Sequence, residues 1–136
     1  MDRSRVAPLS AFDGVPEAEL DAVARLATER EFGEGETLMS EGDFGHALFL
    51  VEDGTADVFT RGEKVGTVGP GDVVGEVAVL ASGRRVASVV ATSPVRAIAL
   101  FKRDVWALEG EAPEAARRLR AAIGEHGRAD ADAASA

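Results

Sequence analysis

The sequence predicts a mainly β protein, a barrel or sandwich of short strands with helices at both ends of the chain. Glycines recur at turn-like intervals from Gly33 to Gly83, and short runs rich in β-branched residues lie between them. Helical periodicity lies outside this region, in residues 8–31 and 102–124. With 136 residues, of which 46% are hydrophobic, the chain suits one domain that buries its own core.

The first predicted element is helical and covers residues 8–31. Pro16 is tolerated in a first helical turn, and the apolar residues that follow it recur at helical spacing, namely Leu20, Val23, Ala24 and Ala27. We therefore expect an amphipathic helix ahead of the β region.

The β region is predicted to span residues 32–101. Its candidate strands are Thr37–Ser40, Ala47–Glu52, Ala56–Thr60, Glu63–Val68, Val86–Thr92 and Val95–Phe101. In the second of these, Leu48 and Leu50 share one face while Phe49 and Val51 share the other, so this strand should be central. The phenylalanines are expected to lie in the core.

Residues 102–124 are predicted to form C-terminal helices. Val105, Trp106 and Leu108 indicate a short helix that breaks before Pro113, where a second helix begins. Residues 128–136 contain no large apolar side chain and are expected to be a disordered tail, which leaves a single domain over residues 1–127.

Composition argues against several classes of function. The formal net charge of −9 disfavours direct binding to nucleic acid, and no segment is apolar enough to enter a membrane, so a cytoplasmic protein is expected. After Ile123 too few residues remain for a helix-turn-helix. The chain has no cysteine and only His46 and His126, so neither a metal site nor a metal-dependent cupin enzyme is expected.

The stretch from Gly69 to Ser88 indicates an anion site. Arg85 offers a planar fork that matches two phosphate oxygens, and Gly75 lets the backbone approach a ligand closely. If a helical turn begins after Glu76, the N–H groups of Val77 and Ala78 point at the same anion.

Two residues beside this site need a separate account. A carboxylate next to an anion is repulsive unless it has another task, and Glu76 could accept a hydrogen bond from a ribose hydroxyl. Ser88 lies three residues beyond Arg85, so on a regular strand its side chain points to the opposite face. A local irregularity is needed to bring its hydroxyl to the phosphate.

These residues resemble a known family, the cyclic-nucleotide-binding domains of catabolite activator protein, the regulatory subunit of cAMP-dependent kinase and cyclic-nucleotide-gated channels. Over roughly residues 9–123 the resemblance includes the turns Glu41-Gly42-Asp43, Glu52-Asp53-Gly54 and Gly69-Pro70-Gly71-Asp72. The family cassette, approximately Gly-Glu-x-Ala-Leu and then Arg-x-Ala-Thr or Arg-x-Ala-Ser, is matched in order and spacing by Gly75, Glu76, Ala78, Arg85, Ala87 and Ser88.

The resemblance implies a fold and a set of roles. The fold is a double-stranded β-helix (jelly-roll) barrel flanked by N-terminal and C-terminal α-helices. Glu76 would bind the ribose and Arg85 the phosphate, with Gly75, Ala78 and Ser88 completing the phosphate cradle. Members selective for cGMP often have threonine where this chain has Val86, so cAMP is expected in preference to cGMP.

The expected function is that of a stand-alone sensor that binds a cyclic nucleotide, performs no chemistry on it, needs no cofactor and signals by moving its C-terminal helices. An unidentified protein effector would read that motion, and the chain is expected to be a monomer or a weak dimer. Candidates for covering the base are Arg117, Leu119, Arg120 and Ile123. The alternative is a degenerate, ligand-free protein-interaction domain of the same fold.

Overall fold

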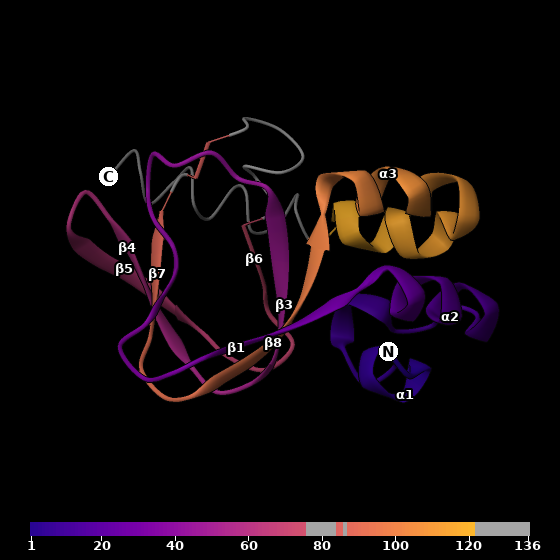
Figure 1. Ribbon diagram of the computed structural model, residues 1–136, viewed down its shortest axis with the longest axis horizontal. Helices are drawn as coiled ribbons and strands as arrows, with labels where there is room; N and C mark the ends of the chain where they lie inside the picture. The colour runs from indigo at the N-terminus through magenta and orange to yellow at the C-terminus, as the bar shows by residue number, and fades with distance from the viewer. Residues whose placement is uncertain (76–83, 86, 122–136) are drawn as a thin grey trace.

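The computed structural model describes residues 1–75, 84–85 and 87–121, and places the helices on one side of two β-sheets (Figure 1). The N-terminal helices are α1 (Arg3–Val6), a 3₁₀ turn η1 (Ser10–Phe12) and α2 (Glu17–Leu26). The strands are β1 (Thr28–Phe32), β2 (Thr37–Met39), β3 (Ala47–Asp53), β4 (Ala56–Thr60), β5 (Glu63–Val68), β6 (Val73–Val74), β7 (Ser88–Ala91) and β8 (Val95–Phe101). Helix α3 (Lys102–Glu111) follows, and residues 113–121 are helical.

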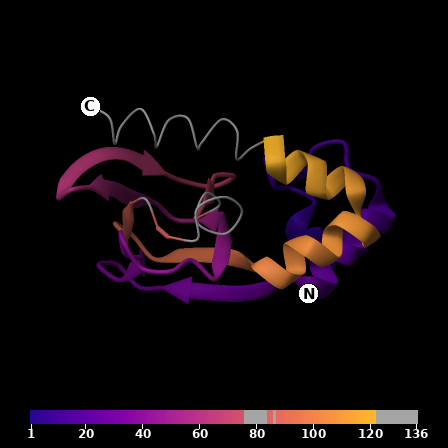
Figure 2. The same cartoon turned by 90° about the horizontal axis from the view of Figure 1, so that it is seen from above.

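The described strands form two antiparallel four-stranded sheets, in the orders β1-β8-β3-β6 and β2-β7-β4-β5. The predicted mainly β fold with flanking helices is confirmed, but the two sheets face each other as an open sandwich rather than closing into a barrel (Figure 2). Strands β1 and β6 lie at the edges of the first sheet, and β2 and β5 lie at the edges of the second.

Strand β3 separates two hydrophobic clusters, as its apolar residues on both faces predict. Leu48 and Leu50 are fully buried on the side of the helices, where they pack with Leu108 and Leu119. Phe49 and Val51 point the other way, into the space between the sheets. Because side chains alternate along a strand, one seven-residue element contributes to both cores.

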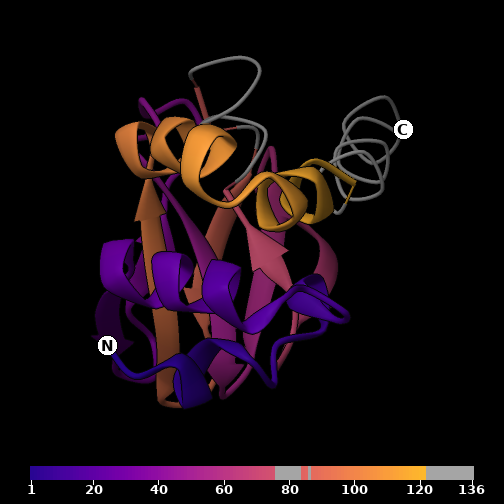
Figure 3. The same cartoon turned by 90° about the vertical axis from the view of Figure 1, so that its right-hand side faces the viewer.

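The helices cross the outer face of the first sheet (Figure 3). α2 buries Leu20 and Val23, which recur at helical spacing, and α3 buries Val105 and Leu108 in the same cluster. No helix in the described part of the chain combines the length and the apolar character needed to cross a bilayer.

Several details differ from the sequence-based expectation, and the first is helix α1, which begins at Arg3 ahead of the predicted helical residues 8–31. Helix α2 ends at Leu26, because the next residues form β1, which pairs with β8 from Thr28 opposite Ala99 to Phe32 opposite Val95. The two-residue strand β6 was not predicted. Phe44 is 63% exposed rather than in the core, and the guanidinium of Arg84 lies 4.4 Å from its ring centroid.

Candidate functional site

A tight turn sets the position of β6 and of the residue that follows it. The Gly69 N–H donates to an Asp72 carboxylate oxygen at 2.8 Å, and the Gly71 N–H donates to the Val51 carbonyl at 2.8 Å. Val51 in turn donates to the Asp72 carbonyl at 2.9 Å. The turn is thereby fastened to the central strand β3, and β6, which follows the turn, leads directly into Gly75.

Gly75 adopts a left-handed backbone conformation with φ of +84°. A Cβ built on this residue would lie 2.4 Å from Nη1 of Arg85 and 3.2 Å from the carbonyl oxygen of Ala47. Glycine is therefore required twice here, first for the backbone conformation and second for the space that the Arg85 guanidinium occupies.

The Arg85 side chain is buried against Gly75 although the two residues lie ten positions apart. The residue is 8% exposed, and its Nη1 donates to the Gly75 carbonyl at 3.0 Å. Its guanidinium carbon also lies 5.9 Å from the ring centroid of Phe49 on β3. The structure thus brings together two of the predicted site residues, Gly75 and Arg85.

The backbone of Arg85 is held by the loop Glu41-Gly42-Asp43, which the sequence predicts only as a turn. The Arg85 N–H donates to the Asp43 carbonyl at 2.7 Å, and the Gly42 N–H donates to the Arg85 carbonyl at 2.9 Å. Arg84 reinforces the same contact, because its Nη1 donates to the Gly42 carbonyl at 2.9 Å. The left-handed φ of +87° at Gly42 marks the bend that presents these groups.

Ser88 is the first residue of β7, and its hydroxyl oxygen accepts a hydrogen bond from the Glu41 N–H at 2.9 Å. The structure therefore places Ser88 against the loop that holds Arg85, and it buries the intervening Ala87. The other predicted site residues, Glu76, Val77, Ala78 and Val86, lie outside the described residues.

The C-terminal helical segment is attached to α2 by a carboxylate. One oxygen of Glu19 accepts hydrogen bonds from the N–H groups of Glu114 at 2.8 Å and Ala115 at 3.0 Å, so it caps the first turn of the segment that begins at residue 113. Hydrogen bonds from Arg117 lower the pKa of the Glu114 carboxyl, which keeps a negative charge in the same turn.

The candidates for covering a base are engaged elsewhere in this structure. Leu119 is fully buried in the helix-side core, Arg117 binds Glu114, and Arg120 binds Glu109. Ile123 lies outside the described residues.

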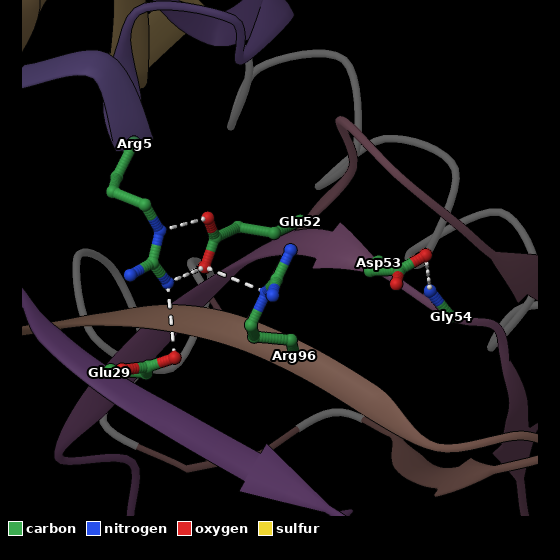
Figure 4. Close-up of polar contacts among 6 residues, drawn as sticks. All are labelled: Arg5, Glu29, Glu52, Asp53, Gly54 and Arg96. Atoms are coloured by element: carbon green, nitrogen blue, oxygen red, sulfur yellow. Dashed lines mark hydrogen bonds and ion pairs between the residues drawn. The ribbon is translucent and has the colours of Figure 1, made fainter.

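A second charged cluster lies between α1 and the first sheet (Figure 4). Arg5 binds both carboxylate oxygens of Glu52, at 2.9 and 2.7 Å, and also contacts Glu29 at 3.1 Å. Arg96 lies 3.8 Å from Glu52, whose side chain is 8% exposed. The hydrogen bonds that Arg5 donates to Glu52 and Glu29 raise the pKa of Arg5, so the cluster fastens α1 to β3 and β1 through an arginine that stays charged.

Comparison with known proteins gives a family match over the same region. A family model described as "Cyclic nucleotide-binding domain" matches residues 29–109, which include both Gly75 and Arg85. Among curated proteins, the cyclic AMP receptor protein of Thermus thermophilus is 32% identical over 117 residues, which is 82% of this chain and 54% of the relative. The chain thus spans about half the length of that relative.

Solved structures agree with this match. The catabolite activator protein of Thermus thermophilus superimposes with a TM-score of 0.78 at 32% identity, covering 90% of this chain and 59% of the other. A regulatory subunit of a cAMP-independent protein kinase A from Trypanosoma cruzi, solved with guanosine bound, gives a TM-score of 0.74 at 31% identity. That match covers 82% of this chain and 41% of the kinase subunit.

Proposed function

This chain belongs to the cyclic nucleotide-binding domain family, and we propose that it is a sensor that binds cAMP in preference to cGMP and performs no chemistry on it. In this proposal the bound nucleotide changes the position of the C-terminal helices, and a protein effector reads the change. The homologues named above are regulatory or sensor proteins, which supports a binding role.

The buried Arg85 guanidinium is the observation that carries the proposal. Burying a charged group costs free energy unless specific contacts hold it, and the Gly75 carbonyl provides one such contact to Arg85. The guanidinium presents several N–H donors in one plane, which suits the two exocyclic oxygens of a cyclic phosphate. Gly75 supports this role, because its carbonyl orients the guanidinium and its missing side chain makes room for it.

The remaining site residues are assigned by the family motif. We propose that Glu76 accepts a hydrogen bond from the ribose hydroxyl, that the N–H groups of Val77 and Ala78 bind the phosphate, and that Val86 lies beside the base. Ser88 fits the phosphate role chemically, because a hydroxyl that accepts a hydrogen bond from Glu41 can still donate its own hydrogen.

The preference for cAMP rests on Val86, which offers no hydroxyl to the guanine amino group. The relative from Thermus thermophilus is named for cyclic AMP, which supports the same ligand. The guanosine-bound kinase subunit is the reason to test guanine ligands in parallel.

Signalling through the C-terminal helices is supported by a short chain of backbone contacts. The loop that holds the Arg85 backbone at Gly42 and Asp43 continues to His46, whose carbonyl accepts a hydrogen bond from the Lys102 N–H at 3.2 Å. Lys102 is the first residue of α3. A ligand that shifts Arg85 can therefore shift the start of α3, provided that it binds the two arrangements with different affinity.

The second candidate function is a ligand-free protein-interaction domain of the same fold. The acidic net charge of −9 suits a basic partner in either case, so charge does not separate the two functions. Ligand binding does separate them. Oligomeric state, which we propose to be a monomer or a weak dimer, can be read from the same samples by light scattering.

The test is thermal unfolding and titration calorimetry with cAMP and cGMP. A ligand present at about 100 times its Kd stabilises the folded state by roughly 2.7 kcal/mol. We expect cAMP to raise the Tm of the wild type more than cGMP does, and Arg85→Ala to abolish both shifts. Arg103→Ala is the matched control, because the Arg103 side chain is 81% exposed on α3, and it should respond like the wild type.

Arg85→Lys separates charge from geometry, since lysine keeps the positive charge but loses the planar fork; we expect it to bind at least tenfold more weakly than the wild type. An unchanged wild-type Tm with both nucleotides, confirmed by calorimetry, would overturn the sensor proposal and leave the interaction domain.

A further inference from the structure

Two guanidinium groups lie against the ring of Phe49, which points into the space between the sheets. Arg85 approaches the Phe49 ring centroid to 5.9 Å, and Arg30 on β1 approaches it to the same distance. Arg30 also lies 5.4 Å from the ring of Phe32, which meets Phe49 edge-on at 5.7 Å. The two rings thus form a platform that holds a second arginine near the first.

The sequence of the first sheet explains how Arg30 reaches this platform. Arg30 shares a face of β1 with Phe32, which belongs to the cluster between the sheets. Its partner on the neighbouring strand β8 is Ala97, and the next residue of β8 on that face is Ala99. Because both side chains are small, the arginine can extend across β8 to the ring of Phe49 on β3.

Arg30 differs from the other arginines of this sheet region in its charge environment. Among the residues that the structure describes, Arg30 forms no ion pair, whereas Arg5 and Arg96 each lie beside Glu52. The neighbouring Glu29 points to the opposite face, where it contacts Arg5. The Arg30 side chain therefore lies on the face of the sheet that carries Phe49, and within the described residues no carboxylate pairs with it there.

The two guanidinium carbons are at most about 12 Å apart, because each lies 5.9 Å from one centroid, and this is comparable with a Debye length of about 10 Å in 0.1 M salt. At such a separation two like charges repel each other, and an anion held by one of them is attracted by the other. A phosphate bound by Arg85 is therefore attracted by the Arg30 charge as well, whereas a neutral ligand is not.

We propose that Arg30 is a specificity-determining residue of the ligand site, which favours charged cyclic nucleotides over neutral nucleosides. Arg30 acts at a distance, through the electrostatic field at the phosphate and through the Phe49 ring, which both arginines contact. It does not touch the ligand. This inference rests on the proposed function, since it presupposes that the phosphate binds to Arg85.

The experiment measures the Kd of cAMP and of adenosine, which has the same base and ribose but no charge. Calorimetry is done for the wild type, Arg30→Met, Arg30→Lys and Arg30→Glu in low and high salt. In about 0.05 M salt Arg30→Met should weaken cAMP binding about fourfold and Arg30→Glu about tenfold or more, while Arg30→Lys stays near the wild type. Adenosine binding should not change.

High salt and a matched arginine provide the controls. In about 0.5 M salt the effect on cAMP should shrink to less than twofold, because the charges are then screened. Arg96→Met removes a positive charge from the opposite face of the same sheet and should leave cAMP binding unchanged. Thermal unfolding of each variant without ligand reports any loss of folding separately.

The outcomes distinguish the two proposals. A wild type that binds cAMP, together with an Arg30→Met variant that binds it equally well in low salt, overturns the role of Arg30 and leaves the sensor function standing. Equal losses in Arg30→Met and Arg96→Met overturn it as well, since the effect is then one of net charge. A wild type that binds no cyclic nucleotide overturns both proposals.

Discussion

At the scale of single residues, Gly75 joins backbone conformation to ligand chemistry. Its φ of +84° is one that residues with a side chain rarely adopt, and its carbonyl orients the buried guanidinium. Gly35 has nearly the same conformation, with φ of +86°, but a Cβ built there meets no atom within 4 Å. Comparison of Gly75 with Gly35 therefore separates the effect of a glycine on backbone conformation from its effect on the space left for a neighbouring side chain.

Replacing each glycine by alanine tests this distinction. Both variants should lose about 1–2 kcal/mol of folding stability from the left-handed backbone alone. Only Gly75→Ala should also weaken cAMP binding, by more than tenfold, because the new methyl group displaces Nη1 of Arg85. Chemical denaturation gives the stability and calorimetry gives the Kd. Equal affinity in the two variants would show that the position of Arg85 does not depend on Gly75.

At the scale of helices and strands, the elements predicted correctly are those whose ends the sequence marks with turn residues. Strands β4, β5 and β8 begin and end where the sequence places them, because glycine turns bound β4 and β5 and Ser93-Pro94 precedes β8. β1 was missed because four of its five residues are exposed at a sheet edge and its charged residues are as common in helices. β6 was missed because two residues carry no period.

The contacts of the candidate site also divide into those that the sequence predicts and those that it does not. Gly75 and Arg85 could be paired from sequence because the family motif fixes their spacing. The loop at Gly42 and Asp43, and the platform at Phe49, could not be predicted, because their contacts with Arg85 depend on how distant segments meet in the folded chain. Sequence periodicity gives the face of a residue and not its partner across the sandwich.

The cap that Glu19 provides to the C-terminal helical segment is an element-scale contact with a testable energy. Glu19→Ala leaves two N–H groups at the start of that segment without their acceptor, which should cost about 1 kcal/mol. Glu19→Gln keeps an acceptor oxygen and should lose less. Glu17→Ala, on the same helix and paired with exposed Arg3, is the control and should be near neutral.

Hydrogen exchange at Glu114 and Ala115 measures this cap directly. Both amides should exchange faster in Glu19→Ala than in the wild type or in Glu17→Ala. Unchanged exchange at these two amides would mean that packing of the buried Leu119 and Ala115, rather than the carboxylate, holds the segment in place.

At the scale of the whole molecule, the helical layer and the sandwich share the first sheet, and β3 contributes Leu50 to one core and Phe49 to the other. Loss of either core removes the packing of one face of that strand. A domain of this size whose central strand serves both cores should therefore unfold in one cooperative step, without a state in which the sandwich remains folded and the helices do not.

The single tryptophan makes this cooperativity measurable, because Trp106 lies on α3 in the helical layer while the far-ultraviolet circular dichroism signal reports both layers. We expect the two signals to give the same urea midpoint in the wild type. They should also coincide in Leu108→Ala, which opens a cavity in the helix-side core, and in Val89→Ala, which does so between the sheets, each at a cost on the order of 2–3 kcal/mol. A tryptophan transition that precedes the circular dichroism transition in Leu108→Ala alone would mean that the helical layer detaches separately. In that case a ligand could release the helices without loosening the sandwich, and the contact between His46 and Lys102 would be the hinge.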